Sequence, residues 1–332
     1  MIDCSQNSER GAALITVLMI IAAMAVVAVG ISQVVSSATQ RARALDTQAQ
    51  IRLYAIAAEE VAKLQIGDLL AGVSNQLVAD LPGLGEAQTF PIEGGLITVR
   101  AADATNCFNL NRLVQISEGV ERKVNPEALT EYIQLLEATS QDRSEASALA
   151  SALVDWMDGD SSAGVGGAED SYYQAETPPY RTSSRPLENL SELRAIRGYS
   201  QDVMARISPM VCALPDRTNL ASDLPLNINT LTEAQAGLLS AAFSGELSID
   251  DARSIIASRP LGGWPDIETL LLEPAIAQIA VDQRKLDRLS IVTGLVEVSA
   301  EVAYREQVMN LQYLFDTRLG HEVKALRRRR VG

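Results

Sequence analysis

An apolar stretch near the start of the chain is the feature that most constrains its fold. No charged residue occurs between Ala12 and Gln40, and the segment from Ala12 to Ile31 is almost continuously apolar. A transmembrane helix needs about 20 such residues, whereas the apolar part of a cleaved signal peptide has only about 7–15. The preceding MIDCSQNSER is not basic, and no apolar run precedes Cys4 as in a lipoprotein signal. The sequence therefore predicts a retained anchor, although arginines on both flanks leave its direction open.

Charge and composition exclude several functional classes for the rest of the chain. Lysine and arginine number 28 against 42 acidic residues, giving a formal net charge of −14. Such a body repels phosphate backbones, so we predict no nucleic-acid partner. The sole histidine, His321, lies close to the C-terminus and removes most Ser/His/Asp, Cys/His and multi-histidine metal sites from consideration. We therefore expect a protein without enzymatic activity, and a calcium-dependent hydrolase is the weakest alternative.

Periodicity predicts a long helix, a small sheet and a helical region. Apolar residues recur at helical spacing after the anchor, with no proline, so one helix is expected to continue to about residue 72. The turn-rich segment 80–95 ends it. Strands are expected over 96–103 and 107–113 and again in the last 45 residues or so, where polar and apolar residues alternate. Helices are expected between them, the first of them capped by Asn125.

Three features leave alternatives open on residue patterns alone. Cys107 and Cys212 would suit either a disulfide of an exported protein or two buried thiols. The acidic, glycine-rich segment 155–173 suits either Ca²⁺ or a solvated turn, and Ala163 stands where an EF-hand needs glycine. The terminal KALRRRRVG suits a disordered basic tail, or an electrostatic contact with anionic lipid or an acidic partner.

A helix-hairpin-helix pattern is expected in the segment LNINTLTEAQAGLLSAAFSGELSIDDARSIIASRPLGGW. Thr230 with Glu233, and Ser248 with Asp251, have capping-box spacing. Some DNA-uptake proteins share the NINT opening, so a DNA-binding minor pilin is the alternative function. The turn between the expected helices is acidic, however, and should repel a duplex. Structural packing is the favoured interpretation.

The boundary of the anchor resembles the prepilin-peptidase site of type IV pilins and pseudopilins. A polar leader ends in Arg10-Gly11 and is followed directly by AALITVLMII. The resemblance implies cleavage after Gly11 on the cytoplasmic face and methylation of the new N-terminus, Ala12. Most members have glutamate at the fifth mature position, whereas this chain has Thr16. In lacking this glutamate the chain resembles minor pseudopilin K of type II secretion systems. In that family the missing carboxylate marks the subunit at the fibre tip.

The resemblance to the pseudopilin K family extends over most of the chain. The segments CFNLNRL, DWMDGD, GAEDSYY and LPLNINT resemble segments in the sequences of that family. They imply a Cys107–Cys212 disulfide and a Ca²⁺ site formed by Asp158, Asp160, Glu169 and Asp170, with Asp155 less firmly assigned.

The family implies an α+β fold with a long N-terminal transmembrane α-helix, a pilin-like small antiparallel sheet and a large inserted all-α subdomain. The expected boundaries are leader 1–11, anchor 12–34, pilin-like domain 35–123 and 288–320, insertion 124–287 and basic tail 321–332.

The expected function is that of a minor pseudopilin that nucleates the secretion pseudopilus and supports protein secretion across the outer membrane. The body is expected in the periplasm, with one pass through the bacterial inner membrane and a cytoplasmic N-terminus. Expected partners are the I- and J-type pseudopilins, the H-type pseudopilin, the inner-membrane assembly platform and prepilin peptidase. The secretin and secreted cargo are further candidate contacts.

Overall fold

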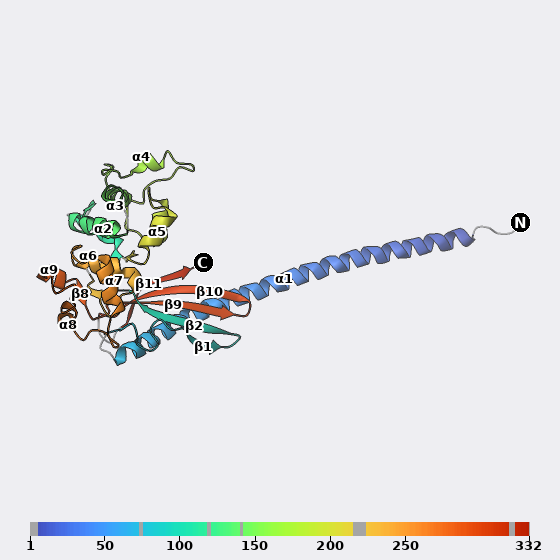
Figure 1. Cartoon of the computed structure of the whole chain (residues 1–332). Helices are drawn as coiled ribbons and strands as arrows, with labels where there is room; N and C mark the ends of the chain where they lie inside the picture. Colours follow the sequence, from blue (N-terminus) through green and yellow to red (C-terminus); the bar gives the residue numbers. More distant parts are fainter. Residues whose placement is uncertain are drawn as a thin grey trace.

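One helix of 66 residues, α1 (Gln6–Ala71), dominates the outline of the molecule (Figure 1). The computed structural model describes residues 6–72, 76–117, 121–139, 142–214, 224–318 and 323–331. The first five residues of the expected leader, and His321, lie outside these ranges. The most apolar part of α1 has a mean hydropathy of 2.9, and none of it is buried against the rest of the described structure. It is long and apolar enough to span a membrane. The expected continuous helix is confirmed.

The C-terminal part of α1 packs across a five-stranded antiparallel sheet. The strands lie in the order β1 (Gln88–Ile92), β2 (Gly95–Asp103), β9 (Leu295–Tyr304), β10 (Gln307–Asp316) and β11 (Lys324–Val331). The helix contributes buried residues at spacings of seven and four positions, namely Ile51, Ala58, Ala62, Ile66 and Leu70. These spacings place the side chains on one helix face, so the sheet has a hydrophobic core on this side.

A second core lies in the helical body, which the chain forms between β2 and β9. Its longer helices are α2 (Pro126–Ala138), α3 (Arg143–Met157), α5 (Gln201–Ile207), α6 (Ala236–Ala242) and α7 (Ile249–Ala257). Short helices are α4 (Asp170–Tyr173), α8 (Ile267–Leu271), α9 (Gln283–Leu286), η1 (Leu110–Leu113), η2 (Leu190–Ala195) and η4 (Glu233–Gln235). Short strand pairs are β3 (Phe108–Asn109) with β6 (Val211–Cys212), β4 (Val114–Ser117) with β5 (Glu121–Val124), and β7 (Leu226–Asn227) with β8 (Leu289–Ser290). Figure 1 places this body beyond the end of the sheet, away from the N-terminus.

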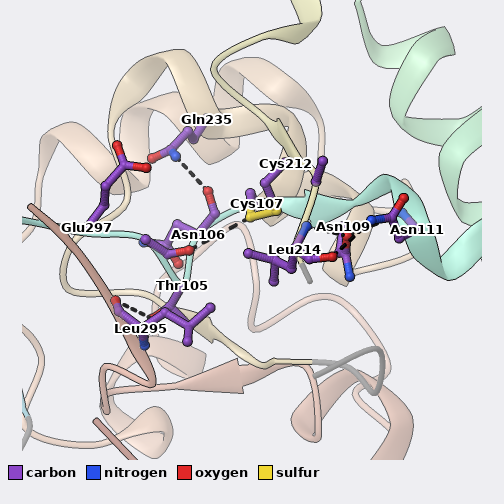
Figure 2. Close-up of a disulfide and its surroundings, with 12 residues drawn as sticks. Thr105, Asn106, Cys107, Asn109, Asn111, Cys212, Leu214, Gln235, Leu295 and Glu297 are labelled. Carbon is purple, nitrogen blue, oxygen red and sulfur yellow. Dashed lines mark hydrogen bonds between the residues drawn. A yellow bond between two sulfur atoms is a disulfide. The ribbon is translucent and has the colours of Figure 1, made fainter. Parts of the chain in front are cut away.

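The Cys107–Cys212 disulfide ties the start of the helical body to a segment 105 residues later. Figure 2 shows the bond between two short segments, with Asn106, Asn109 and Asn111 beside it. Asn106 is held in turn by Gln235, whose Nε2 donates to the Asn106 carbonyl oxygen at 2.8 Å. The cysteine pair that the family resemblance implies is therefore formed, and the free-thiol alternative is wrong for this structure.

Several boundaries differ from those expected from sequence. The helical core includes residues from Phe108 to Leu289, because residues 108–114 pack against helices instead of joining the main sheet. The expected bounds of the insertion, 124–287, stay a prediction. Within 107–113 only Phe108 and Asn109 are strand, and the next four residues form η1. Strand β1 forms inside the segment expected to be turns. Asn125 does cap α2 as expected, accepting from the backbone N–H groups of Glu127 and Ala128.

The basic C-terminal segment is a strand rather than the expected tail. β11 pairs antiparallel with β10, from Lys324 opposite Asp316 to Val331 opposite Asn310, with a bulge that leaves Leu326 without a partner residue in the register. Arg328 also reaches α1, where its Nη2 donates to Glu59 Oε1 at 2.8 Å. Backbone pairing and this ion pair hold a segment whose composition alone suggested disorder.

Candidate functional site

The acidic segment forms a cluster of carboxylates at the end of α3. Asp142 caps the start of this helix by accepting from the backbone N–H of Glu145 at 2.9 Å. Asp155 lies in the last helical turn, and Asp158 is the C-cap residue. The chain then turns through the glycine-rich loop and returns with Glu169, the residue before α4. The loop thus brings two parts of the chain together around one point.

Three of the expected ligands meet at this point. Asp158, Asp160 and Glu169 each offer a carboxylate oxygen, and these oxygens lie within 4.8 Å of one another. Asp158 and Glu169 are buried, whereas Asp160 is exposed. In the described part of the chain, Asp158 Oδ1 and Glu169 Oε1 are buried without any hydrogen-bond partner. Buried charged oxygens without partners are costly, so this arrangement favours a bound cation.

The pKa values of the carboxyl groups in the cluster also favour a bound cation. Burial, together with the neighbouring charges of Asp160 and Asp155, raises the pKa of Asp158 to about 6. Burial and the neighbouring charge of Asp158 raise the pKa of Glu169 to about 7. Each shift arises because negative charge is placed in a poorly solvated site beside other negative charge. A hard divalent cation with oxygen ligands would remove this cost, and Ca²⁺ fits the donor set.

The carboxylate of Asp155 accepts hydrogen bonds from the backbone of the loop itself. Both of its carboxylate oxygens lie 3.1 Å from the backbone nitrogen of Gly164, and the backbone of Ala168 also donates to it. Burial still raises the pKa of Asp155, and the backbone donors partly oppose that rise. A Cβ added at Gly167 would lie 2.0 Å from Asp155 Oδ2, so only glycine fits there. Asp155 therefore shapes the loop that presents the other carboxylates.

Asp170 lies at the start of α4 and outside the group of three. Its Oδ1 accepts from both the backbone nitrogen and Oγ1 of Thr182, each at 2.9 Å. These bonds, the backbone one first, lower the pKa of Asp170. Its role as a ligand stays a prediction, while its contact with Thr182 ties α4 to the following loop. Sequence reasoning did not single out Thr182 or Gly167, although Gly167 is the first residue of the GAEDSYY segment.

Aromatic side chains lie behind the acidic loop. Trp156, next to Asp155 in α3, packs edge-on against Tyr173 with ring centroids 5.2 Å apart. Tyr180 contacts both of these rings. Arg197 reaches the loop from the far side and donates to the Gly167 carbonyl oxygen at 3.0 Å. This rigid backing limits how far the carboxylates can separate, which is a requirement for selective ion binding.

The expected processing and tip-marker residues lie in α1. The backbone of Gly11 and Ala12 is part of the helix, and cleavage between them is not tested by the fold. Thr16 is exposed, and its Oγ1 donates to the Ala13 carbonyl oxygen at 2.9 Å. The hydroxyl group of Thr16, at the position that carries glutamate in most pseudopilins, is therefore hydrogen-bonded within its own helix.

The part of α1 between the apolar segment and its C-terminal end also carries an apolar stripe that nothing in the described structure covers. Leu45, Leu53, Ile56 and Leu64 are 67%, 59%, 67% and 70% exposed. Their spacing of eight, three and eight positions places them within about a 100° sector of the helix. A stripe of this kind on a helix is suited to packing against another helix.

The asparagines of the NINT segment, Asn227 and Asn229, make hydrogen bonds inside the protein. Asn227 Nδ2 donates to Leu77, Asp103 and Thr293, at 3.1, 2.9 and 2.9 Å. Asn229 makes two hydrogen bonds with the backbone of Trp264. In the turn between α6 and α7, Glu246 pairs with Lys285 at 2.7 Å. These asparagines hold the fold, and we find no feature of this turn that favours a duplex.

Comparison with protein families identifies close relatives. Models described as type II secretion system (T2SS), protein K match residues 106–216 and 226–291. Type II secretion system protein K of Pectobacterium carotovorum is 34% identical over 277 residues, covering 80% of each chain. The protein of the same name from Aeromonas hydrophila is 34% identical over 268 residues, covering 79% of each chain.

A solved structure has a similar fold. It is described as the crystal structure of the GspK-GspI-GspJ complex from the enterotoxigenic Escherichia coli type 2 secretion system. The match has a TM-score of 0.71 and 28% identity, and it covers 88% of this chain and 99% of the solved one. The similarity therefore extends over most of this chain and nearly all of the solved one.

Proposed function

Because this chain belongs to the type II secretion system protein K family and is a minor pseudopilin, we propose that it caps the tip of the pseudopilus. In this proposal it nucleates the fibre with other minor pseudopilins and so supports protein secretion across the outer membrane. The I- and J-type pseudopilins are the proposed direct partners, because the solved relative was crystallised in a GspK-GspI-GspJ complex.

The exposed stripe on α1 is the observation that carries this proposal. Leucine and isoleucine side chains at Leu45, Leu53, Ile56 and Leu64 lie on the part of the helix beyond the anchor. Burying each of them against a partner helix would contribute about 1.5–3 kcal/mol. The stripe thus offers a lateral contact along the fibre axis, on the helix that every subunit of such a fibre would use.

The helical body supports a position at the tip. It lies beyond the end of the sheet that is farthest from the N-terminus (Figure 1). A subunit added above this chain would have to pass that bulk. Thr16, which has no carboxylate to neutralise the N-terminus of a preceding subunit, supports the same position.

Anchoring and processing complete the proposal. The chain is a single-pass membrane-anchored protein, and we propose the bacterial inner membrane with the body in the periplasm. Prepilin peptidase would cleave after Gly11, Ala12 would be methylated, and the assembly platform would extract α1 into the fibre. The secretin and cargo are proposed contacts of the exposed helical body.

We further propose that Asp158, Asp160 and Glu169 bind Ca²⁺, with Asp170 as a fourth candidate ligand. The two buried oxygens without hydrogen-bond partners support this assignment. The ion would have a structural role, since it would fix the loop between α3 and α4. We propose no catalytic activity for the site.

Co-purification of full-length protein with the I- and J-type pseudopilins in neutral detergent tests the tip assignment. The double variant Leu53→Glu with Ile56→Glu should lose the complex, because it places charge in the proposed helix contact. Leu261→Glu is the matched control, since Leu261 is 94% exposed but lies in the helical body. If the double variant still forms the complex as well as the control does, the stripe is not the contact.

A further inference from the structure

A basic cleft lies between strand β11 and the helical body. It has a volume of about 630 Å³, within the range of ligand-binding pockets. Five arginines line it, Arg122, Arg185, Arg327, Arg328 and Arg329, against one acidic residue, Glu188. The whole chain has a net charge of −14. Positive charge is therefore concentrated at one place on an acidic protein.

The fold assembles this cleft from segments far apart in sequence. Leu326 of β11 packs with Leu214 and Leu314 in a small core between the sheet and the helical body. Arg327 follows it and donates to the Ala213 carbonyl oxygen at 2.7 Å. β5 and the loop before η2 supply Arg122 and Arg185 on the opposite wall.

Counter-charges neutralise some of these arginines but not all of them. Arg327 Nη2 lies 3.8 Å from Glu297 Oε2. Arg328 is fully engaged by Glu59. Arg185 pairs with Glu188 at 3.3 Å, but both side chains are more than half exposed, so the pair is weak. The hydrogen-bond partners of Arg122 and Arg329 are neutral oxygens, those of Ser184 and Gln312. Arg122 Nε is buried without a hydrogen-bond partner in the described part of the chain. The cleft thus retains unused positive charge.

We propose that this cleft binds an acidic, extended polypeptide segment of a partner protein. Carboxylates would meet the guanidinium groups of Arg122, Arg185 and Arg329, which match them in geometry and charge. An extended segment fits because β11 has a neighbouring strand on one side only, as far as the described residues show. An unpaired strand edge favours a partner in extended conformation.

The position of the cleft argues against anionic lipid. The Arg328–Glu59 contact places β11 beside residue 59 of α1. That residue lies about 40 Å along the helix axis from the end of the apolar segment at Ile31. Electrostatic attraction to a membrane surface decays over about 8–10 Å at physiological salt. The headgroups are therefore out of reach of these arginines.

The test measures binding of a fluorescein-labelled peptide of alternating glutamate and valine to full-length protein in neutral detergent. Arg185→Gln with Arg329→Gln should weaken binding about tenfold, because two charge pairs are lost. Arg185→Lys with Arg329→Lys should retain most of the affinity. Arg253→Gln with Arg284→Gln, on α7 and α9, removes the same charge elsewhere and should leave the affinity within about twofold.

Three results would overturn the proposal. The first is equal binding of a peptide with glutamine in place of glutamate, which needs no variant to fold. The second is equal weakening by both glutamine double variants, since the charge would then act non-specifically. The third comes from protein reconstituted in phosphatidylcholine vesicles: loss of peptide binding on adding phosphatidylglycerol would show that lipid fills the cleft. None of these results bears on the pseudopilin contact at Leu53 and Ile56.

Discussion

Asp103, the last residue of β2, accepts a hydrogen bond from Asn227 of the helical body, with 2.9 Å between Oδ2 and Nδ2. The same carboxylate oxygen accepts from the hydroxyl groups of Thr230 and Thr293, each at 2.7 Å. One side chain therefore joins the end of a sheet strand to the NINT segment and to the chain that returns into β9. This junction fixes the helical body on the sheet.

Replacing Asp103 with alanine should destabilise the protein by about 2–3 kcal/mol, because three donors lose a charged acceptor. Urea unfolding followed by tryptophan fluorescence measures this, since Trp156 and Trp264 are buried in the helical body. Glu306→Ala is the control, as Glu306 is exposed in the turn between β9 and β10. Equal unfolding midpoints for the two variants would contradict a structural role for Asp103.

Removal of the disulfide should lower stability by about 4–5 kcal/mol on the chain-entropy model, because the bond closes a long loop. The loop spans 105 residues. The variant Cys107→Ala with Cys212→Ala tests this by the same urea measurement. Cys4→Ala, which alters the leader instead, should behave as the unmodified protein. A midpoint for the double variant indistinguishable from that of Cys4→Ala would refute the prediction.

Gly167→Ala should disturb the acidic loop, because its new Cβ would lie 2.0 Å from Asp155 Oδ2. Overpacking of this kind costs about 1–3 kcal/mol, and we expect a lower Ca²⁺ affinity as well. Gly159→Ala is the matched control in the same loop, since a Cβ there meets nothing within 4 Å. Calorimetric titration of both variants with Ca²⁺ checks the prediction, which fails if they bind the ion equally.

The response of stability to pH should reverse sign when Ca²⁺ is present. Without the ion, the raised pKa values of Asp158 (about 6) and Glu169 (about 7) make the folded protein bind more protons than the unfolded chain. That stabilising effect is present at low pH and lost as pH rises through the folded pKa values. Thermal midpoints in chelator should therefore fall from about pH 5 to about pH 8.

In excess Ca²⁺ the midpoint should instead rise over the same range, because the ion competes with protons for the carboxylates. The variant Asp158→Asn with Glu169→Gln should flatten both trends. Parallel curves with and without Ca²⁺ for the unmodified protein would show that the cluster is a solvated turn.

Local sequence determined the elements whose stability depends on neighbouring residues. The anchor follows from the uninterrupted apolar run between Ala12 and Ile31, since hydrophobicity and helix length are local properties. The start of α2 follows from Asn125 and Pro126. Strands β2, β9 and β10 follow from alternation along the chain. The family resemblance added the cysteine pair and the acidic loop, which local pattern left open.

Tertiary structure decided the features that depend on residues far apart in sequence. Arginine-rich β11 becomes a strand because β10 supplies its backbone partners and Glu59 neutralises Arg328. The three carboxylates meet, while Thr182 holds Asp170 apart from them, because the loop after α3 closes on Asp155. Asn227 joins the helical body to the sheet because its side chain donates a hydrogen bond to Asp103 at the end of β2. Such contacts gain their free energy only once distant segments are already in place, so no short window of sequence reveals them.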